Sequence, residues 1–299
     1  MGVGAAVSDA ILGFTIPGRG ARGRLVRLDG VSAEILAAHD YPAACSALLG
    51  EALALTALMG SLLRQDEGQV TVQAQAQGGP VSMLVADYRP VGAMAEVRGY
   101  LQHGAGAATG ASLPDLFGEG YLAITLEATA AAERYQGIVP LEGATLAEAA
   151  EAYFNGSEQL PTLVRLAAAP GANGWRAAGL LLQHLPRGEV DAPRLGVSGD
   201  VPGVPADWAH VAALAGTVTA DELLDAGLPF DALLWRLFNE DEVRVTPPVT
   251  VVKGCRCSLP YIRGVLAGFP EEERLAMRGD DGLIGVDCGF CARRFELAL

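Results

Sequence analysis

Four closely spaced cysteines near the C-terminus constrain the fold of this chain more than any other feature. They form a C-x-C pair, Cys255 and Cys257, and a C-x2-C pair, Cys288 and Cys291, separated by thirty residues. Zn²⁺ prefers four tetrahedral ligands, and four protein thiolates would leave no open coordination position for a substrate. The spacing therefore predicts a structural or regulatory site that holds one Zn²⁺ per chain in the reduced state, and not a hydrolytic centre.

The cysteine spacing also leaves other chemistry open. An iron–sulfur cluster, or thiols that bind no metal and serve a redox or structural role, would use the same residues. One intervening residue brings the thiols of Cys255 and Cys257 close enough to form a small, strained disulfide. Positive charge favours the thiolate, which both binds metal and reacts with peroxide, so the site is suited to act as a redox switch. Four basic residues flank the pairs: Lys253, Arg256, Arg293 and Arg294.

The segment that carries the four cysteines is short and electrically neutral. From Lys253 onward it contains seven basic and seven acidic residues, so the first 252 residues carry the whole net charge of −14. A segment of about 47 residues cannot bury a large core, and bound metal would supply much of its folding free energy. We expect a C-terminal zinc domain over residues 246–299. The fifth cysteine, Cys45, lies in an apolar helix pattern and is interpreted as a small buried apolar residue.

The remainder of the chain has the composition of a globular protein. Its 299 residues are 51% apolar and 19% charged, and at roughly 100–200 residues per domain this length suggests about two domains. Residues 1–185 combine strand and helix patterns, so we predict an α+β fold: a mixed α/β domain with an antiparallel-rich sheet. The alternation over 69–77 predicts a strand with Val70, Val72 and Ala74 facing inward. Other strands are expected at 24–28, 83–87, 94–99, 121–126, 135–139 and 163–166, and helices at 31–38, 43–63 and 145–154.

The composition changes at about residue 186. Residues 186–205 contain four prolines and four glycines with little periodicity, which predicts a linker. Two helices are expected after it: one begins with the capping box at 219–222, and the other carries one modest apolar stripe over 233–238. Residues 189–242 contain eleven acids against two arginines. Because like charges repel, we predict that residues 186–245 form a metastable, acidic helical linker of low local stability.

Charge and hydropathy argue against two classes of partner. With 21 basic and 35 acidic residues the chain lacks the positive charge that nucleic-acid binding requires, so we expect no nucleic-acid partner. Residues 43–63 are almost all apolar, but Glu51 near their centre would cost about 2.5–3.5 kcal/mol in a bilayer, which predicts a buried helix and no membrane partner. The first twenty residues do not resemble a secretory signal, and clustered thiols suit a reducing compartment. A cytoplasmic protein is therefore expected.

No motif predicts an enzyme or a nucleotide cofactor. The G-x-G-x-x-G match at 18–23 precedes a strand pattern, whereas binding of a pyrophosphate needs a helix N-terminus, so we interpret it as a flexible loop. The chain contains no P-loop and no G-x-S-x-G motif. The spacing of its four histidines is not typical of a catalytic metal site. The histidines are His39, His103, His184 and His210.

Several segments together resemble a known family, the redox-regulated heat shock protein 33 chaperones. The resemblance covers nearly the whole chain, and the segments occur in the same order as in the family. They are HDYP at 39–42, ERYQG at 133–137, SEQLPT at 157–162, WRLF at 235–238 and the C-x-C plus C-x2-C tail.

The resemblance implies an N-terminal α+β substrate-binding domain, a metastable helical linker and a C-terminal zinc domain. It implies that Cys255, Cys257, Cys288 and Cys291 bind zinc in a reduced, inactive form. Oxidation together with unfolding conditions then pairs Cys255 with Cys257 and Cys288 with Cys291, releases zinc and opens the linker. The activated protein, usually a homodimer, holds unfolding client proteins without ATP. Client binding rests on the resemblance alone.

Two other functions use the same cysteines. A thiol–disulfide oxidoreductase would exchange disulfides through Cys288 and Cys291. A zinc-ribbon nucleic-acid binder would need more positive charge than this tail contains. The sequence therefore favours a non-enzymatic, redox-regulated holdase chaperone, with the oxidoreductase as the alternative.

Overall fold

The computed structural model describes residues 8–63, 68–104, 112–127, 134–185 and 206–298. The chain divides into two compact units, the first ending at Lys253 and the second beginning at Gly254. Each unit is described by itself below. The predicted linker at 186–205 lies outside the described residues.

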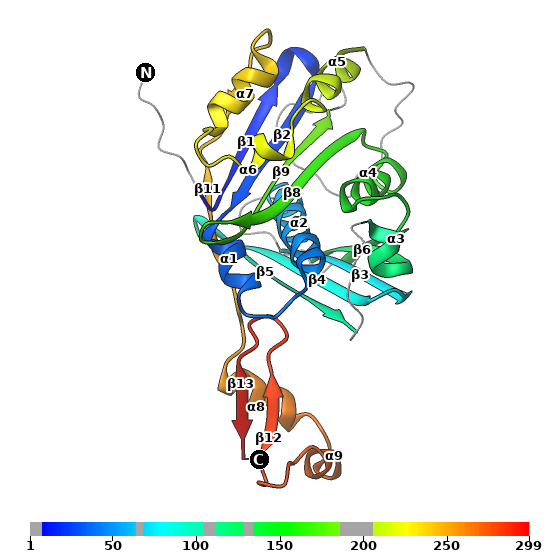
Figure 1. The fold of residues 1–299 in the computed structure, drawn as a ribbon, viewed down its shortest axis with the longest axis vertical. Helices are drawn as coiled ribbons and strands as arrows, with labels where there is room; N and C mark the ends of the chain where they lie inside the picture. The colour runs from blue at the N-terminus through cyan, green and yellow to red at the C-terminus, as the bar shows by residue number, and fades with distance from the viewer. Residues whose placement is uncertain (1–7, 64–67, 105–111, 128–133, 186–205, 299) are drawn as a thin grey trace. The chain divides into compact units, whose positions relative to one another are not determined.

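The first unit is built on a sheet of eleven strands (Figure 1). Its strands are β1 (Ala10–Ile16), β2 (Ala21–Leu28), β3 (Gln69–Gly78), β4 (Val81–Val91), β5 (Met94–His103), β6 (Gly118–Glu127), β7 (Arg134–Pro140), β8 (Thr162–Gly171), β9 (Gly174–His184), β10 (Arg244–Val245) and β11 (Val249–Lys253). The order is β7-β6-β3-β4-β5-β11-β1-β2-β9-β8, and β10 pairs with β1 outside this path. Only β5 and β11 pair in parallel among the described strands, so the prediction of an antiparallel-rich sheet is confirmed.

Helix α2 (Ala43–Gly60) forms the centre of the larger core and packs against β9, β4, β8 and β5. Its length and apolar composition would suffice to cross a membrane, but 78% of it is buried inside the fold, as the buried-helix prediction requires. Gly60 allows a close approach at its end, because a Cβ there would lie 2.1 Å from the ring of Tyr88. Three further helices contribute buried side chains to the same core: α1 (Gly30–Leu36), α3 (Leu113–Phe117) and α4 (Leu146–Gly156). Cys45 is fully buried in this core, as expected of a small apolar side chain.

Three short helices pack with β1, β2, β8 and β9 in a second apolar cluster. These are α5 (Ala206–Ala215), α6 (Ala220–Leu224) and α7 (Phe230–Phe238), and together we call them the acidic helical segment. The predicted capping box of Thr219 and Glu222 is present at α6. Both predicted helices are present as α6 and α7, and the stripe at 233–238 is buried. The count of two helices and the single modest stripe were wrong, because α5 is a third helix and all three bury apolar side chains. Those side chains include Trp208, Val211, Leu223, Leu224, Phe230, Leu233, Leu234, Leu237 and Phe238.

Every predicted strand and helix of residues 1–185 is present, but the short helix α3 and four strands of the first unit, β1, β9, β10 and β11, were missed. β9 contains the run Leu180–Leu182, which is buried on both faces and therefore shows no alternation. β1 and the five-residue β11 become strands through pairing with distant segments. The glycine-rich match at 18–23 spans a tight turn and the start of β2, and no helix follows it there.

The second unit is small. It contains α8 (Leu259–Ala267), α9 (Glu271–Ala276) and the antiparallel pair β12 (Ile284–Asp287) and β13 (Arg294–Leu297). Its buried apolar cluster consists of Ile262, Leu266, Ile284, Phe295 and Leu297, with Cys257, Val286 and Cys288 packed against it. A cluster of this size supplies little hydrophobic stabilisation, as the length of the tail predicts.

Candidate metal centre

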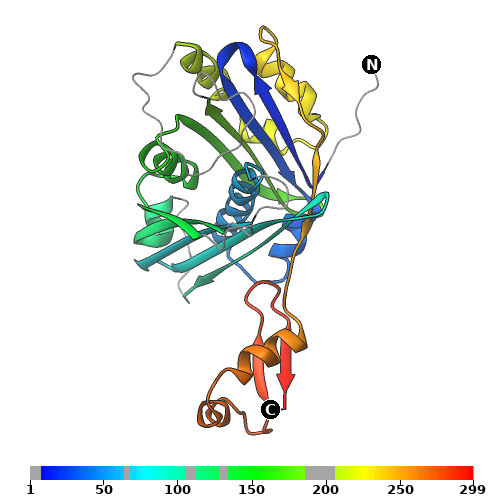
Figure 2. The same ribbon diagram turned by 180° about the vertical axis from the view of Figure 1, so that it is seen from behind.

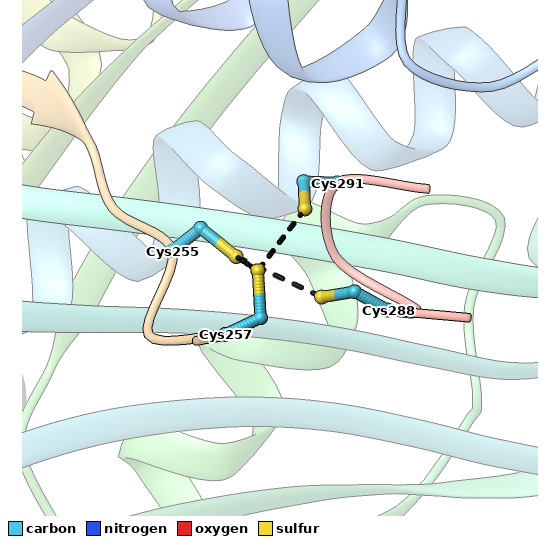
Figure 3. A group of neighbouring side chains, drawn as sticks. All are labelled: Cys255, Cys257, Cys288 and Cys291. Carbon is cyan, nitrogen blue, oxygen red and sulfur yellow. Dashed lines mark hydrogen bonds between the residues drawn. The ribbon is translucent and has the colours of Figure 1, made fainter. Parts of the chain in front are cut away.

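Two loops of the second unit carry the four cysteines (Figure 3). Cys255 and Cys257 lie in the loop that leads into α8. The helix begins after Ser258, whose hydroxyl oxygen accepts a hydrogen bond from the N–H of Tyr261 at 3.3 Å. This cap ends the loop directly after Cys257 and so limits where the C-x-C pair can lie.

Cys288 and Cys291 lie in the turn that joins β12 to β13. The turn is closed by the N–H of Ala292, which donates to the carbonyl oxygen of Cys288 at 2.8 Å, and by the N–H of Cys288, which donates to that of Arg293 at 2.9 Å. Ala292 has a φ of 52°, in the left-handed region that favours glycine. The hairpin thus turns both thiols of the C-x2-C pair towards the first pair.

The four sulfur atoms converge on one point. The Sγ of Cys257 lies 3.1 Å from that of Cys255 and 3.4 Å from that of Cys291, and the Sγ atoms of Cys255 and Cys288 are 3.7 Å apart. All four ligand atoms lie within 4.8 Å of one another. Zinc–sulfur bonds of about 2.3 Å give a tetrahedron with edges of about 3.8 Å, so the donor set fits a four-thiolate zinc site.

The cysteines do not ionise equally. Burial disfavours the thiolate of Cys255, but hydrogen bonds from the backbone of Cys257 and from the neighbouring thiols outweigh this and lower its pKa to about 7. Burial and the adjacent sulfur of Cys255 raise the pKa of Cys257. Burial is also the main reason that the pKa of Cys291 is raised. A divalent cation bound among these crowded sulfurs would stabilise their thiolate forms.

The predicted basic surroundings of the site are partly neutralised. Lys253 Nζ forms an ion pair with Glu34 Oε1 at 2.6 Å. Arg294 lies 3.5 Å from carboxylate oxygens of both Asp287 and Glu296. These ion pairs reduce the positive charge that the two flanking residues could contribute to thiolate formation.

All four predicted ligand residues are brought together, and all four are partly exposed. Cys45 lies in α2 of the first unit, where burial raises the pKa of its thiol. His184 and His39 also lie in the first unit, the former with its pKa lowered by burial and the latter stacked on Tyr41 at 4.8 Å between ring centroids. The cluster can thus bind a metal through four thiolates, and its exposed sulfurs can react with each other when oxidised.

Comparisons with known proteins agree over nearly the whole length of the chain. The family model described as Hsp33 protein matches residues 9–298. The 33 kDa chaperonin of Caulobacter vibrioides strain NA1000 is 40% identical over 306 aligned positions, which cover 97% of this chain and 95% of that protein. The 33 kDa chaperonin of Nitrosococcus oceani is 39% identical and covers 92% of this chain and 86% of that protein.

A solved structure shows the same fold. The crystal structure of the 33 kDa chaperonin (heat shock protein 33 homolog) from Thermotoga maritima superposes with a TM-score of 0.75 at 20% identity, over 97% of this chain and 94% of that chain. The family match spans both the eleven-stranded sheet and the four-cysteine unit. On this evidence the chain belongs to the Hsp33 protein family.

Proposed function

We propose that this protein is a redox-regulated, ATP-independent holdase chaperone that protects unfolding or oxidatively damaged proteins from aggregation. The observation that carries the proposal is the convergence of four sulfurs within 4.8 Å in a unit with a very small apolar core. Family membership and the names of the curated relatives support the chaperone activity. In this proposal the protein is not an enzyme, and it works in the cytoplasm, where thiols stay reduced.

Cys255, Cys257, Cys288 and Cys291 are proposed to hold one Zn²⁺ in the inactive, reduced state. A bound Zn²⁺ would act as a structural cross-link between the two cysteine loops. Because one loop leads into α8 and the other is the turn of the β12–β13 hairpin, their separation would remove the main constraint on the second unit. The five apolar side chains of its core give little stability without that constraint.

Oxidation is proposed to pair Cys255 with Cys257 and Cys288 with Cys291. Two S–S bonds form as the sulfurs lose four electrons, and two molecules of hydrogen peroxide accept these electrons with four protons and become four molecules of water. The sulfurs then no longer act as thiolate ligands. The pairing follows the family resemblance, and peptide mass mapping of the oxidised protein tests it: a Cys255–Cys288 bond would overturn it.

The switch would act through the domain arrangement proposed here: a substrate-binding domain over 1–185, a metastable linker over 186–245 and a zinc domain over 246–299. The helices of the acidic helical segment have ten, five and nine residues, and isolated helices below about 12–15 residues are marginally stable in water. These helices depend on their packing against strands β1, β2, β8 and β9. Release of this segment would uncover the apolar side chains of β1, β2, β8 and β9, which unfolding clients and a second protomer of an activated homodimer would contact.

Light scattering of thermally unfolding citrate synthase tests the proposal. We expect strong suppression of aggregation by the peroxide-treated protein, weak suppression by the reduced zinc form, and the same behaviour for a Cys45→Ala variant. Equal protection by both forms would overturn the redox switch, and protection by neither would overturn the chaperone. Reduction of insulin with dithiothreitol as electron donor examines the alternative oxidoreductase, and catalytic turnover that requires Cys288 and Cys291 would favour it.

A further inference from the structure

Strand β11 lies within the sheet, between β1 and β5 (Figure 2). On one side it pairs antiparallel with β1, through the partners Ala10–Thr250 and Ile11–Val249. On the other side it pairs parallel with β5, from Met94–Thr250 to Val97–Lys253. Within the described residues it is the sole strand that joins β7-β6-β3-β4-β5 to β1-β2-β9-β8. Removal of these five residues would therefore divide one sheet into two.

Few interactions hold β11 in place. Only Val251 is fully buried, at 1% exposure, whereas Thr250 is exposed and the other three side chains are partly exposed. The N–H of Val251 donates to the carbonyl oxygen of Asp9 at 2.8 Å. Val249 is partly buried and packs against the larger core, and Lys253 forms an ion pair with Glu34, whose carboxylate is largely exposed. By contrast, seven of the eight residues of β2 are buried.

The chain connects β11 directly to the metal centre. β11 ends at Lys253, and Cys255 is the second residue after it. When the second unit is folded, it fixes the conformation of the chain that leaves β11. When that unit unfolds, β11 gains an unstructured continuation of 46 residues, from Gly254 to the C-terminus. The entropy of this continuation favours detachment of a strand that buries a single side chain.

If β11 left the sheet, the edges of β1 and β5 that now pair with it would be unpaired. We call the gap between these two edges the slot. β1 and β5 would each expose backbone N–H and C=O groups, which readily pair with another extended chain. The slot also contains an apolar recess, because Val251 belongs to the same buried cluster as Ile11, Ala95 and Val97. Such a slot accepts a strand of about five residues with an apolar side chain at its third position.

We propose that an extended apolar segment of an unfolding client protein replaces β11 between β1 and β5. The inference rests on the proposed holdase function and names its binding mode. Main-chain hydrogen bonds carry the affinity in this mode, so the slot selects extended, apolar segments with little regard to their sequence. A folded protein offers no such free strand, which explains how the slot would distinguish unfolding chains from native ones.

Site-specific photo-crosslinking tests the slot. p-Benzoylphenylalanine replaces Met94, which pairs with Thr250 of β11 and is 44% exposed, or, as a matched control, Ile138 of the outer strand β7, which is 57% exposed. Peroxide-treated protein is irradiated with thermally unfolding citrate synthase while light scattering is recorded. We expect client adducts at least about fivefold more abundant from position 94 than from position 138, and none from the reduced zinc form.

The outcomes distinguish a failure of the holdase function from a failure of the slot. Failure to suppress scattering would contradict the holdase function itself. Suppression with equal adducts at both positions, or with adducts only at position 138, would overturn the slot while leaving the holdase intact. Adducts between two copies of this chain that persist when client is added would show that a second protomer fills the slot, and would also overturn the inference.

A second pair of variants tests the gating by β11 without altering a cysteine. Val251→Ala removes the one buried side chain of β11, and Val164→Ala removes the same atoms from a fully buried position in β8. Loss of this side chain makes detachment of β11 about tenfold more favourable. We expect the reduced Val251→Ala protein to protect citrate synthase while Val164→Ala behaves as the unaltered protein. Equal behaviour of the two variants would contradict the inference.

Discussion

The Nε of Arg27 in β2 donates a 2.8 Å hydrogen bond to the carbonyl oxygen of Leu223 in α6. Its Nη1 donates to the carbonyl oxygen of Leu228 at 2.8 Å, and its guanidinium lies 5.0 Å from the ring centroid of Phe230. Arg27 is 2% exposed, and burial lowers its pKa. One buried side chain thus connects the sheet to the acidic helical segment at several points.

We predict that Arg27→Met weakens the docking of the acidic helical segment by about 2–4 kcal/mol, because buried carbonyl oxygens lose their donors. Hydrogen exchange should accelerate in α6 and α7 and remain unchanged in α2. Arg89→Met is the matched control, since Arg89 is 38% exposed and its ion pair with Glu96 is worth at most about 1 kcal/mol. Equal exchange in the two variants would show that Arg27 does not stabilise this docking.

Metal content should depend on each of the four clustered cysteines and not on Cys45. Reducing purification is expected to yield about one zinc per chain, because the four thiolates complete a tetrahedral site. Cys288→Ser should lose most of this metal and become sensitive to protease after Lys253, whereas Cys45→Ala should keep both properties of the unaltered protein. Elemental analysis checks this. Iron in place of zinc, or full zinc occupancy in Cys288→Ser, would contradict the assignment.

The stability of the first unit should decrease as the pH rises towards neutrality. Burial in α2 raises the pKa of Glu51 from 4.5 to about 7. The folded state therefore binds a proton that the unfolded state releases above pH 4.5, so this contribution is complete below that pH and is lost as the pH rises through about 7. At about 1.4 kcal/mol per pKa unit, the loss reaches about 3 kcal/mol.

Urea unfolding at pH 5 and pH 8 measures this effect. Glu51→Gln should be more stable than the unaltered protein at pH 8 and should show a smaller change between the two pH values. The exposed Glu119→Gln provides the control. A pH dependence of the same size in Glu51→Gln would mean that other groups cause it.

Ala292→Gly should stabilise the turn that carries the C-x2-C pair. Ala292 adopts a φ of 52° and its side chain is exposed, so the substitution relieves backbone strain without removing a buried group. The expected gain is about 1 kcal/mol, less the greater chain entropy of glycine in the unfolded state. Competition with a chromophoric zinc chelator measures it as tighter metal retention. Weaker retention would show that the turn needs the side chain.

The candidate site could be predicted almost completely from sequence. Cys255 and Cys257 are two residues apart, and Cys288 and Cys291 are three apart, so each pair is local and only two loops have to meet. The α6 capping box and the alternation of β3 were likewise readable, because both depend on neighbours within a few residues. The flanking charges were less informative, since the sequence does not show that Glu34 neutralises Lys253 or that Asp287 lies beside Arg294.

The pairing of strands that are distant in the chain could not be predicted from the sequence. β11 is five residues long, and its partners Ile11 and Met94 are more than 150 residues away in the chain, so no local pattern marks it as a strand. The buried face of the acidic helical segment was underestimated for a related reason: its apolar residues are divided among three short helices.

By itself the sequence determined which four cysteines come together, the small neutral tail and most of the strands and helices, because spacing, periodicity and capping act over a few residues. The tertiary structure decided that β11 joins the two halves of the sheet and that Arg27 is buried against the acidic helical segment. Both depend on which distant segments lie side by side, and burial is a property of the neighbours that cover a residue as much as of the residue itself.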